Sequence, residues 1–335
     1  MKWAARMKRY DTVPTAGALG ARLSEESYDS FQKSSLPNLM LALNLVGAVA
    51  HGTGILITRT QARMNIELPI WHNLLVNTGN TSHPVWTRDE YVVHINPVDV
   101  ITAFFGLSFG FHIIVSLFLV ARIYMPESWY TQWYMWGLYY NMAPWRWLEY
   151  FFSAPLMLLI AAPMMGIREI HSIWATVGTL AVTILFGWIT ELHGAYLIEQ
   201  APEPYEFCGW KLTRRWKPGS WKTRWQIHML GYVPYALCWG IVFDRFRLNM
   251  EAVSEIVPDF VNLSVILSFI LFTFFGLTQF LHQFLTYGPS VYWLGEVIYV
   301  TLSFAAKAQL GFVILVQALL PGALFDNVLQ FKIED

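Results

Sequence analysis

Two ionisable residues stand in stretches of the chain that are otherwise apolar. Lys307 lies within LSFAAKAQLGF, and Glu149 lies within WRWLEYFFSAPLM. An ionisable group inside a bilayer costs about 2.5 to 3.5 kcal/mol on insertion scales and usually marks a functional position. A lysine midway along a membrane helix needs a partner or a covalent use, because its side chain does not easily reach either interface.

The covalent use that suits these two residues is a Schiff base between Lys307 and an aldehyde. A protonated Schiff base in apolar surroundings needs a carboxylate counterion, which Glu149 would supply. The alternative is a plain buried ion pair between lysine and glutamate, with no ligand. The two residues alone leave both interpretations open.

These two side chains must be positioned by membrane-spanning helices. The amino-acid composition indicates that the chain contains such helices. The chain has 335 residues, of which 13% are charged and 16% aromatic, with a mean hydropathy of +0.40. This balance is typical of an integral membrane protein. A bilayer span needs about 20 mostly apolar residues, and seven stretches qualify: 38–58, 98–121, 143–166, 172–191, 225–243, 259–286 and 291–320. The sequence therefore predicts an all-α membrane protein with seven helices.

The distribution of charge bears on partners and on orientation. The net charge is −1 and no sign dominates, so nucleic acid is not an expected partner. Cytoplasmic segments of membrane proteins carry the excess of Lys and Arg. With the N-terminus inside, the inner segments hold 13 basic residues: Lys2, Arg6, Lys8, Arg9, Arg22, Lys33, Arg122, Lys211, Arg214, Arg215, Lys217, Lys222 and Arg224. The outer segments hold 7: Arg59, Arg63, Arg88, Arg168, Arg245, Arg247 and Lys332. We therefore expect a cytoplasmic N-terminus and an outer C-terminus.

The chain reads as one membrane domain with two tails and a long loop. We expect a polar cytoplasmic tail over 1–35, a seven-helix domain over 36–322 and an outer tail over 323–335. The first outer loop, 59–97, contains β-prone runs at 66–71 and 91–95, which favour a small hairpin. Asn80 begins a glycosylation sequon whose use the sequence leaves open. Cys208 and Cys238 are expected to be free, and no metal site is predicted.

Other polar residues gather in the cytoplasmic half of the predicted bundle. Ser303 precedes Lys307 by one turn and shares its face. The others come from several helices: Asn44, Ser108, His112, Glu191 and Gln279. A hydrogen-bonded cluster on one side of a mid-membrane lysine is what a Schiff-base proton needs in order to be held and relayed. For His112 taken singly, a packing histidine is an equally good interpretation.

Several motifs resemble those of the heliorhodopsin family. The third helix has RWLEY followed by FSAPLM, and the seventh has the pattern GE..Y..LS..AK ending at Lys307. The second helix has S...H, formed by Ser108 and His112. Weaker matches are ILFGWITE, ending at Glu191, and F..F...Q, formed by Phe272, Phe275 and Gln279.

This resemblance implies a rhodopsin-like bundle of inverted topology, with the N-terminus in the cytoplasm. It implies all-trans retinal bound covalently to Lys307, with Glu149 as counterion and Ser303 beside the Schiff base. The residues expected around the cofactor also include Ser108, His112, Ser153 and Gln279. The residues of a candidate proton path are Glu191, His112, Arg146, Glu296 and Asn44. A homodimer helped by the first outer loop is also implied.

Helix 1 departs from the family pattern. Heliorhodopsins usually have a histidine and a nearby glutamine there in the polar cavity, where this chain has Asn44 and Gly47. One proton-accepting group is therefore expected to be missing.

Three classes of function remain: a light sensor, a light-driven or light-gated ion transporter, and a seven-helix enzyme or receptor without a chromophore. Pumping rhodopsins place polar groups at three positions of helix 3, which here are Glu149, Ser153 and Ile160. Ile160 cannot donate a proton, so active pumping is disfavoured. The prediction is a light-absorbing photoreceptor, not an enzyme, with an unidentified signalling partner. Passive light-gated proton transport is the alternative.

Overall fold

The computed structural model describes residues 35–61, 67–77, 86–125, 128–139, 141–207, 210–253, 259–284 and 289–314. The elements follow in the order α3 (Leu36–Gln61), β1 (Leu68–Asn77), β2 (Trp86–Ile95), α4 (Pro97–Tyr124), α5 (Trp129–Tyr139), α6 (Pro144–Met164), α7 (Ile170–Tyr196), β3 (Ile198–Phe207), β4 (Trp210–Trp216), α8 (Trp221–Val253), α9 (Asp259–Phe284) and α10 (Pro289–Ile314). The predicted outer tail, most of the N-terminal tail, Cys208 and the Asn80 sequon lie outside the described residues. The predicted domain limits therefore stay predictions.

Seven long helices match the seven predicted stretches, and local sequence explains where several of them begin. The side chain of Asn96 accepts a hydrogen bond from the N–H of Val98 at 2.9 Å, and Pro97 occupies the first position of α4. Glu169 caps α7 by accepting hydrogen bonds from two N–H groups of its first turn. Such caps satisfy donors that have no partner within the helix. Pro144 begins α6, where a proline loses no helical hydrogen bond.

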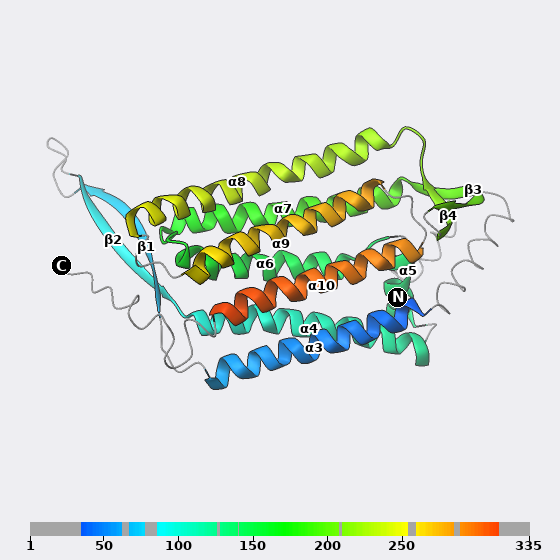
Figure 1. Cartoon of the computed structure of the whole chain (residues 1–335), viewed down its shortest axis with the longest axis horizontal. Coiled ribbons are helices and arrows are strands. Elements are labelled where there is room, and N and C mark those ends of the chain that lie inside the picture. Colours follow the sequence, from blue (N-terminus) through cyan, green and yellow to red (C-terminus); the bar gives the residue numbers. More distant parts are fainter. Residues whose placement is uncertain are drawn as a thin grey trace.

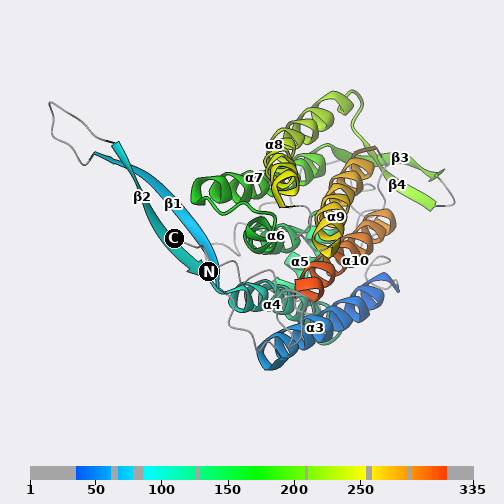
Figure 2. The ribbon, with the colours of Figure 1, turned by 60° about the vertical axis from the view of Figure 1, so that its left-hand side comes forward.

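The long helices lie side by side along one direction (Figure 1). Seen from a turned view, the long helices form a ring in which α6 lies between α4 and α7 (Figure 2). Around that ring α3 packs on α4, α7 on α8, and α10 on both α9 and α3, whereas α8 and α9 pack less closely. Five of the described helices are long and apolar enough to cross a membrane: α3, α4, α6, α7 and α9. With α8 and α10 beside them, these helices form the predicted seven-helix bundle.

The hairpin expected in the first outer loop is present. Strands β1 and β2 pair antiparallel from Leu68 opposite Ile95 to Asn77 opposite Trp86, so they are longer than the predicted runs. The backbone N–H of Trp71 donates to the carbonyl of Arg168 at 2.8 Å, which fastens the hairpin to the connection between α6 and α7. We call this end of the bundle the loop end.

The opposite end carries two elements that the sequence analysis did not predict. One is the short helix α5, and the other is the antiparallel hairpin β3–β4, which has a register irregularity between Gln200 and Tyr205. The segment of β3 reads IEQAPEPYEF, whose prolines and glutamates are uncommon in strands and hide the pattern. We call this end, where α3 begins, the tail end (Figure 1).

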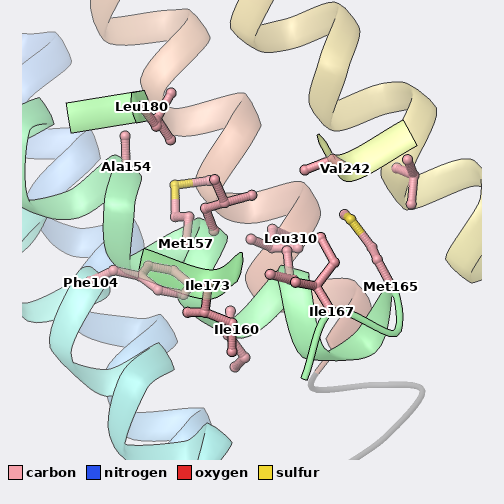
Figure 3. Packing of buried hydrophobic residues seen from close by; sticks show 14 of the residues in the cluster. Phe104, Ala154, Met157, Ile160, Met165, Ile167, Ile173, Leu180, Val242 and Leu310 are labelled. Atoms are coloured by element: carbon pink, nitrogen blue, oxygen red, sulfur yellow. The ribbon is translucent and has the colours of Figure 1, made fainter. Parts of the chain in front are cut away.

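Apolar side chains fill the half of the bundle towards the loop end. Phe104, Ile160, Met165, Ile167 and Leu310 belong to one buried cluster there. Figure 3 shows these side chains meeting from α4, α6, α10 and the connection between α6 and α7. The core is therefore asymmetric along the bundle, as the sequence indicated, with its polar residues gathered towards the tail end.

Close packing of α7 on α6 gives a first prediction. A Cβ added to Gly187 would lie 2.4 Å from Cζ3 of Trp147, a side chain that is 5% exposed. We expect Gly187→Ala to lower the free energy of unfolding by about 1 to 3 kcal/mol through overpacking, seen as a lower Tm in detergent. Gly178→Ala in the same helix is the matched control, because no atom lies within 4 Å of its added Cβ. Equal Tm values for the two variants would contradict this account.

Candidate functional site

The centre of the site is a buried ion pair between α10 and α6. Nζ of Lys307 lies 2.8 Å from Oε1 of Glu149, and the two residues are 2% and 7% exposed. A lone charge at this depth would be strongly unfavourable, whereas a close pair of opposite sign compensates much of the loss of hydration. Sequence reasoning named both residues, and the structure brings them into direct contact.

Two serines complete the surroundings of this pair. Nζ of Lys307 donates to Oγ of Ser303 at 2.5 Å, one helical turn earlier. Oγ of Ser108, from α4, donates to Oε1 of Glu149 at 2.7 Å. The ring of Tyr150 lies beneath the ammonium group, with its centroid 5.3 Å from Nζ. The lysine and the carboxylate are thus held by α4, α6 and α10 together.

A second polar group lies next to the ion pair, between α3 and α4. Nδ1 of His112 lies 2.8 Å from Oδ1 of Asn44. Gly47 leaves room for the imidazole, because a Cβ at that position would lie 2.8 Å from Nε2 of His112. The departure of helix 1 from the family pattern therefore has a physical counterpart: Asn44 pairs with the histidine and Gly47 admits its ring.

His51 also belongs to this group, and the sequence analysis missed it. Its ring stacks on that of His112, with centroids 5.2 Å apart and planes 11° apart. It is 1% exposed, and neither ring nitrogen has a hydrogen-bond partner among the described residues. The signal available in the sequence was its spacing, one turn after Gly47 on the same helix face. Helix α3 thus contributes an imidazole to the site at position 51, and not at Asn44 or Gly47, where the family pattern was compared.

Towards the tail end, a larger network surrounds Arg146. Its guanidinium forms ion pairs with Glu191 and with Glu296, and all three side chains are buried. Its carbon Cζ lies 3.9 Å from the centroid of the Tyr299 ring. Glu191 is the best-satisfied member, since it also accepts hydrogen bonds from Trp147, from Tyr292 and from the backbone N–H of Ala143. The residues of the candidate proton path thus form two groups, one at His112 and one at Arg146.

A cavity of about 850 Å³, including the part open to its surroundings, begins at Lys307 and extends among α6, α7, α8 and α9. Its walls are mostly aromatic or aliphatic, and the aromatic ones include Trp147, Tyr150, Tyr235, Phe272 and Phe275.

Four of the predicted cofactor residues line the same cavity: Lys307, Ser303, Ser153 and Gln279. Ser153 has a buried hydroxyl without a hydrogen-bond partner among the described residues, and Gln279 accepts a hydrogen bond from the hydroxyl of Tyr299 at 2.6 Å. A primary amine on the wall of an apolar cavity, with a carboxylate beside it, suits an apolar aldehyde such as retinal. The residues present therefore fit that cofactor.

On the loop-end side of Lys307 the surroundings are different. Ile160 is fully buried within the apolar cluster, in the helix that also carries Glu149. A polar contact that sequence reasoning did not name joins Oγ of Ser268 to Oε1 of Gln309 at 3.3 Å. The side chains of Ser268 and Gln309 do not titrate. They therefore add no ionisable group on the loop-end side of Lys307.

Comparison with known proteins shows the family of this chain. A comparison with curated proteins gave no match. The heliorhodopsin family matches residues 39–319, which is most of the 335-residue chain. Proteins of this family are seven-helix retinal photoreceptors and not enzymes. The chain therefore belongs to the heliorhodopsin family and is a multi-pass, light-absorbing retinal protein.

Proposed function

We propose that Lys307 carries all-trans retinal through a protonated Schiff base and that Glu149 is its counterion. The observation that carries this proposal is the contact of 2.8 Å between Nζ of Lys307 and Oε1 of Glu149 at the wall of an apolar cavity. When bound, retinal supplies the absorption of visible light and an isomerisation that alters its contacts with the protein.

The neighbouring residues then have distinct tasks. Glu149 stabilises positive charge at Nζ of Lys307, and Ser108 holds that carboxylate in place by donating to it. Oγ of Ser303 remains an acceptor for a single N–H at the lysine nitrogen. Ser153 and Gln279 face the cofactor from the walls of the cavity.

We further propose that the protein works as a photoreceptor without active transport. The proton held between Lys307 and Glu149 moves to the polar group at Ser108 and His112, and it later returns from the same side. A return by the same route yields no net transport. The apolar packing around Ile160 supports this, because it offers the proton no relay towards the loop end.

A passive light-gated proton path is the second candidate, and one observation favours it. A small cavity lies between the two polar groups and is lined by Asn44, His112, Arg146, Glu296 and Ser303. Water in this cavity would connect the neighbourhood of Lys307 to the Arg146 network, and Glu191 would continue the path towards the tail end.

The proposed orientation places the tail end in the cytoplasm and the loop end outside. It is supported by the count of basic residues, which the inverted topology of the family resemblance matches. A homodimer through the β1–β2 hairpin is proposed as well, since this hairpin extends away from the helices (Figure 2). The signalling partner would read the cytoplasmic surface at the tail end.

Lys307→Ala tests the attachment site. We expect this variant to have no visible absorption band after reconstitution with retinal, because no other lysine among the described residues lies inside the bundle. Lys222→Ala, which removes an exposed lysine before the membrane span, is the control and should keep the band. Size-exclusion chromatography would verify that both variants are folded. A retained visible band in folded Lys307→Ala would rule out the proposed attachment.

Transport is tested by photocurrent recording with and without a proton gradient. We expect no steady current at zero driving force. A passive current, where one is measured, should reverse with the gradient and fall at least about tenfold in Glu191→Gln or His112→Ala, because a relay that loses one of its proton-transfer groups typically slows by this much or more. His171→Ala, at an exposed histidine of the loop end, serves as control. A steady current at zero driving force would refute the proposal that the protein works without active transport. A passive current that neither substitution reduces would reject the proposed proton route.

A further inference from the structure

The turn that leads from β4 into α8 carries several hydrogen-bond donors close together. It reads Lys217-Pro218-Gly219-Ser220, and Gly219 has φ 74°, a backbone conformation that favours glycine. The N–H of Ser220 donates to the carbonyl of Lys217 at 3.1 Å, and the N–H of Arg224 donates to the carbonyl of Ser220 at 3.1 Å. The helical hydrogen bonds of α8 therefore begin at Arg224, and the preceding N–H groups point out of the helix end.

Ser220 stands where a capping side chain is expected, but it does not cap. Serine at this position normally accepts a hydrogen bond from the second or third N–H of the helix. Here its hydroxyl has no hydrogen-bond partner among the described residues, although the residue is only 7% exposed. No backbone carbonyl of the described residues accepts a hydrogen bond from the N–H groups of Lys222 and Thr223. Among the described residues, the buried hydroxyl of Ser220 thus has no hydrogen-bond partner, and two backbone N–H groups at the same turn have no backbone acceptor.

Positive charge surrounds these donors. Lys217 and Lys222 are exposed, and Nζ of Lys217 donates a hydrogen bond to the carbonyl oxygen of Tyr196 at 2.8 Å. The guanidinium of Arg224 lies over the ring of Trp216, with Cζ 4.0 Å from its centroid. The N-terminus of α8, a helix of 33 residues, adds the partial positive charge of its dipole.

The nearby acidic groups do not cancel this charge. Glu199 of β3 is already paired with Arg215, with Oε1 and Nε 3.0 Å apart. Glu203, further along β3, is exposed and forms no ion pair with the described residues. The turn therefore keeps an excess of positive charge on the side that faces out of the bundle.

Two exposed aromatic side chains fix the depth of the turn. Tyr196, at the end of α7, is 77% exposed, and Trp221, at the start of α8, is 57% exposed. Tyr and Trp gather at the level of the lipid headgroups in membrane proteins. Figure 1 shows the β3–β4 hairpin beside these two helix ends, at the tail end of the bundle.

We propose that this turn binds the phosphate of an anionic membrane lipid. The ligand oxygens would accept from the N–H groups at the start of α8, from the hydroxyl of Ser220 and from the ammonium groups of Lys217 and Lys222. Helix N-termini and turns with a left-handed residue bind phosphate by the same means. This site does not depend on retinal or on the proposed photoreceptor role. The experiment below therefore tests the lipid site separately.

Native mass spectrometry of the full-length protein in detergent tests the site. Phosphatidic acid is titrated against phosphatidylcholine of the same acyl chains. We expect phosphatidic acid to bind more tightly, and we expect the double variant Lys217→Gln/Lys222→Gln to weaken its binding by at least about fivefold, the effect of one basic residue at a lipid surface. Ser220→Ala should weaken it by a smaller factor. The double variant Arg245→Gln/Arg247→Gln, which removes the same charge near the other end of α8, should bind as the parent does.

Three outcomes would overturn the proposal. Equal binding of the two lipids, or equal loss in the two double variants, would show general attraction in place of a site. Loss in the lysine variant with no loss in Ser220→Ala would show that the turn itself does not coordinate the phosphate. In a further arm, inorganic phosphate alone is added. Displacement of the lipid by millimolar phosphate, with the same dependence on the two lysines, would identify a site for free phosphate instead of a lipid.

Discussion

The contact between Lys307 and Glu149 constrains most of the bundle. Each charge alone would be strongly unfavourable among apolar helices, and a pair in direct contact is tolerated when further hydrogen bonds satisfy it. Those bonds come from Ser303 and Ser108, which hold α10 and α4 against α6 at this level. The family assignment makes the chain a retinal protein, and the cavity that begins at Lys307 has the lining such a cofactor requires. The contact between Lys307 and Glu149 therefore bears on the packing of three helices, on the compensation of two buried charges and on the proposed chemistry.

The polarity of the core along the bundle decides what a proton released at this pair could do. Towards the tail end it meets the imidazole of His112, on which His51 stacks, and then the network of Arg146 with its two glutamates. Towards the loop end it meets the apolar cluster around Ile160. In the proposed function, this arrangement favours storage and return of a proton over transport across the membrane. It also explains why Glu191 and Glu296 are compatible with burial, since both share one guanidinium and Glu191 accepts three further hydrogen bonds.

Much of this could be predicted from sequence because burial in a membrane is so restrictive. Seven apolar stretches, a lysine and a glutamate inside them, and a β-prone first loop each have few alternative explanations. The helix α5 and the β3–β4 hairpin were missed, because aromatic-rich and proline-containing segments lack a clear period. His51 was missed for another reason: its importance depends on which face of α3 packs on α4, and a single sequence does not specify that. The gap left by Gly47 becomes meaningful only when the ring of His112 is seen to occupy it.

The central claim is that Glu149 balances the positive charge at Lys307, and the absorption maximum of Glu149→Gln tests it most directly. Removal of the carboxylate charge should weaken the stabilisation of charge localised at the nitrogen, so the account predicts a shift of the visible band to longer wavelength. Glu191→Gln, which removes a buried carboxylate from the neighbouring network, should shift it less. A maximum in Glu149→Gln identical to that of the parent protein would contradict the account and assign the counterion to another group.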